Sequence, residues 1–324
     1  MKPGKTKIAA LVAAVAIAAP VAAAPIKVDS SLPHYKRQSG VAGNLNSVGS
    51  DTLNNMMTLW AEAFRKEYPN VRIQIEGKGS GTAPPAMIEG TSQLGPMSRS
   101  MKPKEANKFE QKYGFKPTRI AVALDSLAVY VNKDNPVNKL AIPEVDAIFS
   151  TTRKCGHPRD INTWGGVGLK RSWAALPISR YGRNSASGTY GYFKHHAMCK
   201  GDYRSNVKEQ PGSASVVNGV ANDKGGIGYS GIGYKTSGVK AIALSKKEGG
   251  KAYGPTYANV LDGKYPLGRQ LYIYFVKKPH QPVGKLVREF LTFTLTQEGQ
   301  KIVIKDGYLP LPKKVIEKQL AVFQ

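Results

Sequence analysis

The stretch RNSASGTYGYF, residues 183–193, predicts a loop that turns into a helix and offers its first turn to an anion. Ser187 is a natural helix N-cap, and Gly188 allows a ligand to approach the backbone closely. A helix start of this kind has unpaired N–H groups and the positive end of the helix dipole, which both favour an anion. Arg183 adds a planar set of charged donors. The alternative is an ordinary capped junction with an incidental surface arginine.

Small hydroxyl residues precede a predicted helix at three places: GSDT at 49–52, GSGT at 79–82 and ASGT at 186–189. One such turn is weak evidence, because serine and threonine are ordinary N-caps. Three of them, with Arg99 and Arg183 near two of the turns, would surround a tetrahedral oxyanion with hydrogen-bond donors if they converged. The sequence therefore predicts one oxyanion site built from distant parts of the chain.

Strand and helix patterns alternate along the chain. Residues 53–64 carry apolar side chains at helical spacing, residues 71–77 alternate as in a strand, and residues 119–136 form a buried strand pair interrupted by Asp125. Residues 283–311 predict one long helix followed by a tail. This order of elements predicts an α/β architecture with mainly parallel sheets.

The N-terminus has the pattern of a secretory signal peptide. Lys2, Lys5 and Lys7 precede an apolar run that ends in small residues, which predicts cleavage near Ala23. No cysteine follows the run, which argues against a lipoprotein anchor. We therefore expect a signal peptide at 1–23, an extended and poorly ordered lead-in at 24–43, and an exported protein that is periplasmic or secreted.

The chain has two cysteines, Cys155 and Cys199. In an oxidising compartment an even pair predicts a disulfide. The five histidines show no metal-ligand spacing, and the adjacent His195 and His196 would point to different sides of a helix. We expect no metal site and no cofactor.

The formal net charge of +25 comes mostly from lysines that are scattered over the whole chain. Such a charge draws anions toward the protein. The clusters of arginine and aromatic residues that are typical of nucleic-acid readers are not evident. We expect a solvated basic surface, and weak contact with anionic envelope polymers stays open as an alternative.

Several stretches together resemble the periplasmic phosphate-binding proteins of Pst-type ABC transporters. The resemblance covers about residues 44–312 and is carried by VGSDTL (48–53), GKGSGTA (77–83), GPMSRSM (95–101), RNSASGT (183–189), GGIGYSGIGY (225–234) and PLGRQLYIYF (266–275). It implies a type II periplasmic binding protein fold, in which two α/β domains joined by crossover strands close on phosphate. The expected domains are 44–122 plus 267–324 and 123–266. The implied partners are inorganic phosphate and an inner-membrane ABC permease, and the implied state is a monomer.

Carried over by position, the resemblance assigns phosphate binding to Ser50, Asp51, Thr52, Ser80, Gly81, Ser98, Arg99, Arg183, Ser187, Gly188 and Thr189. Some family members have an aspartate where Arg99 stands, and a carboxylate in the family accepts the proton of monohydrogen phosphate. Asp51 is the candidate for that acceptor here, with Asp125 in reserve. Such a carboxylate would accept a hydrogen bond from protonated phosphate and repel sulfate, which carries no proton at neutral pH.

Three classes of function are compared. The first is a phosphate receptor that serves a permease, and the second is a serine hydrolase or phosphatase. The third is a surface or envelope-associated protein of the same fold that binds phosphate or polyanions. The chain lacks a G-x-S-x-G elbow, an H-E-x-x-H helix and a P-loop. We therefore expect a binding protein and not an enzyme.

Overall fold

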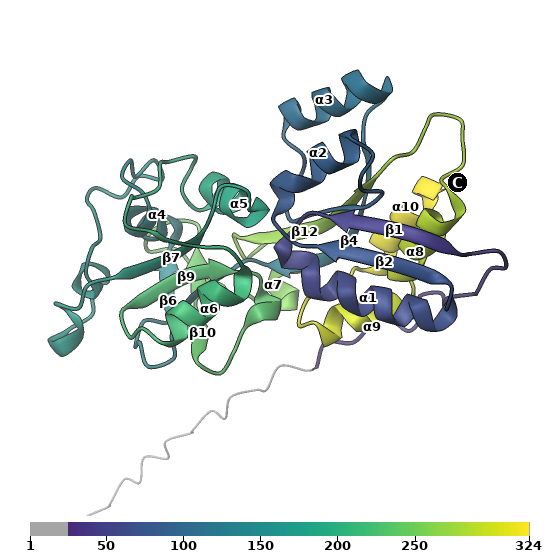
Figure 1. Cartoon of the computed structure of the whole chain (residues 1–324). Coiled ribbons are helices and arrows are strands. Elements are labelled where there is room, and N and C mark those ends of the chain that lie inside the picture. The colour runs from purple at the N-terminus through teal and green to yellow at the C-terminus, as the bar shows by residue number, and fades with distance from the viewer. Residues whose placement is uncertain (1–24, 324) are drawn as a thin grey trace, which may run out of the picture.

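Two bodies, each with its own strands and helices, make up residues 25–323, the part of the chain that this computed structural model describes (Figure 1). The predicted signal peptide at 1–23 lies outside the described residues. The purple N-terminal and yellow C-terminal segments lie together in one body, and the teal and green middle of the chain forms the other. Between residues 25 and 323, no helix combines the length and the apolar character that a membrane crossing requires.

The first lobe has a core formed by residues 32–124 together with 271–316. Its elements are β1 (Gly43–Val48), η1 (Asp51–Leu53), α1 (Asn54–Glu67), β2 (Val71–Glu76), η2 (Ser80–Thr82), α2 (Ala83–Ile88), β3 (Gly95–Met97), α3 (Pro103–Tyr113), β4 (Thr118–Ser126), β12 (Gly268–Phe275), α8 (Lys285–Thr294), α9 (Gln297–Lys305), α10 (Lys313–Leu320) and η6 (Ala321–Phe323). The predicted apolar stripe of α1 faces this core, where Met56, Met57, Trp60 and Phe64 are fully buried. Burial of that face supplies the main driving force for packing the helix on its sheet.

The second lobe has its main core between residues 127 and 267. Its elements are β5 (Ala128–Asn132), β6 (Lys139–Ala141), α4 (Ile142–Phe149), η3 (Trp164–Val167), η4 (Arg171–Trp173), β7 (Ser179–Arg183), α5 (Gly188–His196), β8 (Lys208–Gln210), α6 (Ser213–Ala221), β9 (Gly226–Ser230), η5 (Ile232–Tyr234), β10 (Val239–Ala241), β11 (Ala243–Ser245) and α7 (Tyr257–Leu261). A five-stranded sheet has the order β10-β5-β9-β7-β8. The central strands β5 and β9 are buried along their whole length.

The sheets are mixed, whereas the sequence analysis expects mainly parallel ones. Half of the strand pairs among the described residues are antiparallel. The reason lies in the crossings between the lobes: β4 passes through Leu127 directly into β5, and β12 returns antiparallel to β4, with Arg269 opposite Asp125. Strands joined by a direct crossing have no helix between them. The rule that alternating strands and helices form parallel sheets therefore does not apply to these strands.

The segment expected to be a poorly ordered lead-in is held against the first lobe. It contains no helix before β1 and makes a turn in which the Leu32 N–H donates to the Asp29 carbonyl oxygen at 3.1 Å, but Leu32 and Val41 are buried. The amide of Gln297 donates to the Leu32 carbonyl oxygen at 3.0 Å, and the Tyr35 hydroxyl donates to Glu289 at 3.0 Å. Its few apolar side chains are too widely spaced to predict this packing.

The predicted long helix at 283–311 is divided into α8 and α9. Thr296 has extended backbone angles and caps α9, because its Oγ1 accepts a hydrogen bond from the Gly299 N–H at 3.4 Å. A threonine that binds the backbone in this way favours a helix start over a helix interior. Apolar residues continue on both sides of the break, which is why the sequence pattern predicts a single helix.

The predicted disulfide between Cys155 and Cys199 is confirmed, with a Cα–Cα distance of 5.4 Å. It ties the loop that follows α4 to the chain just after α5. Helix α5 begins with the Ser-Gly-Thr turn of the second lobe, so the bond limits how far the far end of this helix can move.

Candidate functional site

The predicted hydroxyl-bearing turns of the first lobe lie next to one another at the ends of β1, β2 and β3. The Ser50 N–H donates to the Pro96 carbonyl oxygen at 2.8 Å, and the Gly79 N–H donates to the Gly49 carbonyl oxygen at 2.7 Å. Ser80 and Ser98 are both fully buried, and their Oγ atoms lie 3.2 Å apart. Three loops that are separated in sequence therefore form one polar surface.

The turns differ in whether their serine caps the helix. The Ser187 Oγ accepts a hydrogen bond from the Tyr190 N–H at 3.3 Å, as the N-cap prediction requires. The Ser50 side chain makes no such capping bond. Ser80 lies inside η2, whose N-cap is Gly79, and its Oγ accepts a hydrogen bond from the Ser98 N–H at 3.0 Å. The capping explanation therefore accounts for Ser187 but not for the two serines of the first lobe.

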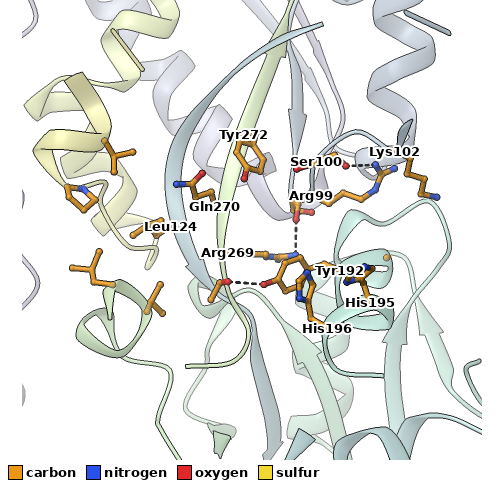
Figure 2. Close-up of a pocket in the computed structure, with 17 residues that line it drawn as sticks. Arg99, Ser100, Lys102, Leu124, Tyr192, His195, His196, Arg269, Gln270 and Tyr272 are labelled. Atoms are coloured by element: carbon orange, nitrogen blue, oxygen red, sulfur yellow. Dashed lines mark hydrogen bonds between the residues drawn. The ribbon is translucent and has the colours of Figure 1, made fainter. Parts of the chain in front are cut away.

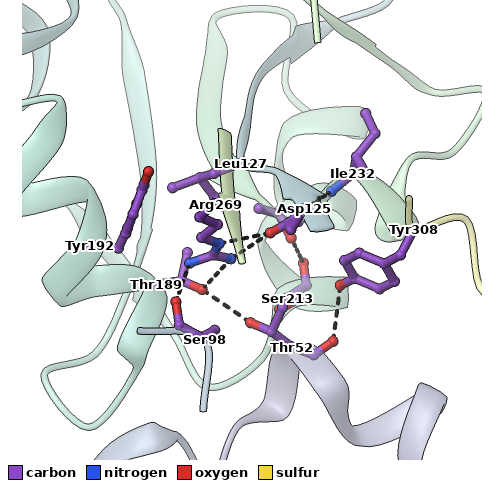
Figure 3. A network of polar contacts seen from close by, with 12 residues as sticks. Thr52, Ser98, Asp125, Leu127, Thr189, Tyr192, Ser213, Ile232, Arg269 and Tyr308 are labelled. Atoms are coloured by element: carbon purple, nitrogen blue, oxygen red, sulfur yellow. Dashed lines mark hydrogen bonds and ion pairs between the residues drawn. The ribbon is translucent and has the colours of Figure 1, made fainter. Parts of the chain in front are cut away.

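The turn of the second lobe lies directly against these loops. The Gly81 N–H donates to the Ala186 carbonyl oxygen at 2.9 Å, and the hydroxyl oxygens of Thr52 and Thr189 lie 3.0 Å apart. A Cβ at Gly188 would lie 2.2 Å from the Ser80 Oγ, so a larger residue could not be accommodated without a shift. The three turns thus meet at the boundary between the lobes, where Figure 3 shows Thr52, Ser98 and Thr189 close together.

Arg183 lies at the end of β7 and is 2% exposed. Its Nη1 lies 3.1 Å from the Asp51 Oδ2 and donates to the Ser213 Oγ at 2.8 Å, while its Nη2 donates to the Pro211 carbonyl oxygen at 3.1 Å. Burial lowers the pKa of the Arg183 guanidinium, and the Asp51 charge opposes that shift. Among the described residues the buried Nε has no hydrogen-bond partner, so one charged donor remains for an anion.

Asp51 is the first residue of η1, and its side chain is 21% exposed. Its Oδ2 accepts hydrogen bonds from the N–H of Ser213 at 2.8 Å and from the Ser213 Oγ at 2.7 Å. No described residue donates a hydrogen bond to its Oδ1. One carboxylate oxygen is therefore held in place, while the other has no hydrogen-bond donor among the described residues.

Arg269, which the sequence pattern does not single out, is buried on β12. Its Nε and Nη2 lie 2.8 and 2.7 Å from the Asp125 Oδ2, and its Nη1 donates to the Ser98 carbonyl oxygen at 3.1 Å. Nη2 also donates to the Thr189 Oγ1 at 3.0 Å, so this side chain contacts the turns of both lobes (Figure 3). Asp125 and Arg269 each lie in a stretch of mainly apolar strand residues, and this feature could have pointed to the pair. Opposite charges that are buried in such strands are usually paired.

Ser213 and two tyrosines were also missed. The Tyr234 hydroxyl donates to the Asp51 carbonyl oxygen at 3.0 Å, and the Tyr308 hydroxyl donates to the Thr52 carbonyl oxygen at 2.9 Å. Both hydroxyls fix the backbone of the first turn. Nothing in their spacing distinguishes them from core tyrosines.

Arg99 is the one predicted site residue that the structure does not bring into this cluster. Its Nη1 and Nη2 each lie 2.7 Å from a carboxylate oxygen of Glu105, and Nη1 also donates to the Ser100 carbonyl oxygen. A bidentate pair of this kind occupies the planar face of the guanidinium. The capping-box position of Glu105 at the start of α3 accounts for this pairing.

The cluster is suited to a small anion. It combines hydroxyl groups, backbone N–H groups and the unpartnered Nε of the buried Arg183 guanidinium, a set of donors that stabilises negative charge. Within residues 25–323 no group of three or more His, Cys, Asp or Glu side chains is arranged to hold a metal ion.

Comparison with known proteins identifies the family. A model described as a PBP superfamily domain matches residues 36–298. The phosphate-binding protein PstS of Pseudomonas aeruginosa is 57% identical over 299 residues, which covers 92% of this chain and 93% of that protein. The protein SphX of Synechococcus elongatus is 31% identical and covers 92% of this chain and 86% of its own length.

Solved structures agree with this assignment. A Clostridium perfringens protein with bound phosphate, named as a phosphate ABC transporter substrate-binding protein, has a TM-score of 0.69 and 25% identity over 83% of this chain and 100% of its own. An ABC-type phosphate transport receptor from Vibrio cholerae shares the fold, with a TM-score of 0.64 at 22% identity over 83% of this chain and 100% of its own. The predicted type II fold is thereby confirmed. The chain belongs to the PBP superfamily and, within it, to the family of the phosphate-binding proteins named PstS.

Proposed function

We propose that this protein binds inorganic phosphate at the boundary between its lobes. The observation that carries the proposal is the meeting of the three turns, in which Gly81 contacts Ala186, Thr52 contacts Thr189 and Arg183 lies beside Asp51. The printed names and the bound phosphate of the relatives add support.

The physical reason is the cost of removing a dianion from water. A buried phosphate loses its hydration, so its oxygens need donors in fixed positions. The turns supply hydroxyl and N–H groups, and Arg183 supplies a charged donor at its unpartnered Nε. We propose as its ligands Ser50, Asp51, Thr52, Ser80, Ser98, Arg183, Ser187, Gly188 and Thr189. We leave Arg99 out because Glu105 occupies its guanidinium, and Gly81 because its N–H already donates to the Ala186 carbonyl oxygen.

Selection against sulfate falls to Asp51 in this proposal. Its Oδ1 has no donor among the described residues, whereas both oxygens of Asp125 are occupied, Oδ2 by Arg269 and Oδ1 by the Ile232 N–H at 3.0 Å. Protonated phosphate can donate to Asp51, and fully ionised sulfate would only be repelled. Asp125 is therefore the weaker candidate.

The biological role follows from the family. We propose that the exported protein acts in the periplasm as a monomer and delivers phosphate to an inner-membrane ABC permease without chemical turnover. Residues 44–122 with 267–324 would form one jaw and residues 123–266 the other. The high positive charge would raise the local concentration of anions near the protein. The same charge would allow weak contact with anionic envelope polymers.

Isothermal titration of the mature protein with phosphate, sulfate and pyrophosphate tests the proposal. We expect a saturable heat signal with phosphate at one site per molecule and little or none with sulfate, and phosphate released on denaturation should be recovered unchanged. Equal affinity for sulfate would contradict the role of Asp51, and the absence of any phosphate signal would overturn the proposal as a whole.

A further inference from the structure

A groove runs along the boundary between the lobes beside Arg269 (Figure 2). Its main part is a cavity of about 840 Å³. A smaller cavity of about 270 Å³ shares Arg99, Lys102, Gly191 and His195 with it and extends to Ser187. We call the two together the lateral groove. Because its walls come from both lobes, an occupant would contact both.

One wall of the lateral groove is positively charged. Arg99 and Lys102 line both of its parts, and Lys194 and Lys200 line the smaller one. Among the described residues no aspartate or glutamate lines either cavity. Glu105 pairs with Arg99 and Asp202 pairs with Lys194, but Lys102 and Lys200 are exposed and have no ion pair within residues 25–323. An excess of positive charge therefore faces the groove.

The opposite wall is apolar. It is formed by Leu124, Val260, Leu261, Pro312 and Val315. Leu261 is 46% exposed, which is unusual for a large aliphatic side chain. Figure 2 shows Leu124 across the groove from Arg99 and Lys102.

Flat aromatic rings separate the two walls. The rings of Tyr192 and His196 are stacked, with their centroids 4.1 Å apart and their planes 27° apart. Burial lowers the pKa of His196, so its ring is neutral at neutral pH and behaves as an aromatic surface. The Arg269 guanidinium lies on the face of Tyr192, 5.2 Å from the ring centroid. Because His196 and Arg269 cover the faces of Tyr192, the floor of the groove is a flat aromatic stack, and a planar ligand can pack against its edge.

From these features we infer that the lateral groove is a second binding site, for an organic anion with a flat apolar body and one acidic group. An inorganic anion would leave the apolar wall in contact with water, and a neutral apolar molecule would leave the lysines unpaired. The volume lies within the range that is typical of small-molecule sites. The site does not depend on the proposed phosphate function, because most of its lining lies outside the phosphate cluster and only Ser98, Ser187 and Arg269 adjoin both.

Fluorescence titration with 8-anilino-1-naphthalenesulfonate tests this site in the mature protein. We expect one saturable dye site per molecule. N-phenyl-1-naphthylamine, which has the same rings without the sulfonate, should bind about tenfold more weakly or worse, because it cannot pair with the cations. Equal binding of the two dyes, or no saturable binding, would overturn the inference.

Variants locate the dye. Leu261→Asp places a carboxylate in the apolar wall, and Lys102→Glu reverses the charge of the other wall. Each should weaken sulfonate-dye binding by about tenfold or more. Lys104→Glu is the matched control, because it makes the same charge change at an exposed position two residues away that does not line the groove. It should leave the dye affinity within about twofold of wild type.

Calorimetry with phosphate separates a local effect from misfolding. Leu261→Asp lies outside the proposed phosphate cluster, so it should keep the phosphate affinity and the melting temperature of the wild-type protein. Dye binding that is the same in Leu261→Asp, Lys102→Glu and Lys104→Glu would place the dye elsewhere and reject the lateral groove as its site.

Discussion

Arg183 and Arg269 are both buried at the boundary between the lobes, and each lies against an aspartate, but their hydrogen bonding differs. Every nitrogen of Arg269 has an acceptor among Asp125, Ser98 and Thr189. Arg183 has acceptors for Nη1 and Nη2 and none for Nε within the described residues. Asp125 is fully buried, whereas the Asp51 side chain is 21% exposed.

We propose that this difference separates a structural ion pair from a ligand-binding one. A buried pair with all its donors satisfied has nothing to offer a ligand, and its role is to hold β4 and β12 together where they cross between the lobes. A pair with a free donor and a free acceptor oxygen is incomplete until a ligand supplies the missing partners. The four predictions below test this division.

Arg269→Met should have the largest effect on stability. It leaves the Asp125 carboxylate buried without a cation, which costs about 3–5 kcal/mol of the free energy of unfolding. Urea denaturation followed by circular dichroism measures this loss. Phosphate affinity should fall less than in Arg183→Ala, because Arg269 would act only through Ser98 and Thr189.

The double variant Asp125→Leu/Arg269→Met is the control for Arg269→Met. Replacing both charges by apolar side chains removes the unpaired carboxylate, so much of the lost stability should return. A double variant that is as unstable as Arg269→Met would show that packing, and not the ion pair, holds the crossing strands together.

Arg183→Ala should have the largest effect on phosphate affinity. Removing a buried charged donor next to Asp51 should cost about 2–5 kcal/mol of binding free energy, or roughly thirtyfold to several thousandfold in affinity. Isothermal titration calorimetry measures this change. Arg99→Ala is the matched control, because Glu105 already occupies that guanidinium, and its affinity should stay within about twofold of wild type. Equal losses in the two variants would contradict the comparison.

The turns could be predicted from the sequence because local chemistry determines them. Ser187 caps α5 through its own side chain, and glycine at 188 is required by contact with Ser80. Local patterns do not predict that the turns meet in space, because no rule of spacing brings residue 52 next to residue 189. The family resemblance implies that meeting.

The partners of the charged side chains could not be predicted from local sequence. Arg99 directly follows Ser98, which lies in the cluster, but the Arg99 side chain pairs with Glu105, six residues away. Arg269 pairs with Asp125, 144 residues away, because β12 returns beside β4. The pairing of β12 with β4 produces both the mixed sheet topology and the ion pair between Arg269 and Asp125. This pairing is long-range, and the periodicity of the strands does not encode it.

Asp51→Asn should reduce selectivity more than it reduces affinity. The amide no longer repels sulfate, so the ratio of phosphate to sulfate affinity should fall by about tenfold, which corresponds to about 1.4 kcal/mol. Competition calorimetry with the two anions measures the ratio. Asp125→Asn is the control: it should lower stability and keep the selectivity. A loss of selectivity in Asp125→Asn alone would assign the proton-accepting role to Asp125.

Asp306 is a third carboxylate near the boundary, and it has no cation partner within residues 25–323. It accepts a hydrogen bond from Asn55 through Oδ1, while its Oδ2 is buried without a partner among the described residues. Burial raises the pKa of Asp306 from 3.8 to about 6, against the opposing effect of Asn55. The folded protein therefore holds this proton more tightly than the unfolded chain does.

The consequence is a loss of stability as the pH rises, which should be the smallest of the four effects. The contribution of Asp306 is fully present below about pH 4 and is lost as the pH rises through about 6. A two-unit shift corresponds to about 3 kcal/mol for a fully buried group, and partial exposure of Asp306 reduces this to about 1 kcal/mol. The difference in unfolding free energy between wild type and Asp306→Asn, measured in urea from pH 4 to pH 7, should change by this amount. If the unfolding free energies of the two proteins changed with pH in parallel, the unpaired carboxylate of Asp306 would cost the fold nothing. A missing hydrogen-bond partner would then be a weaker reason to distinguish Arg183 from Arg269.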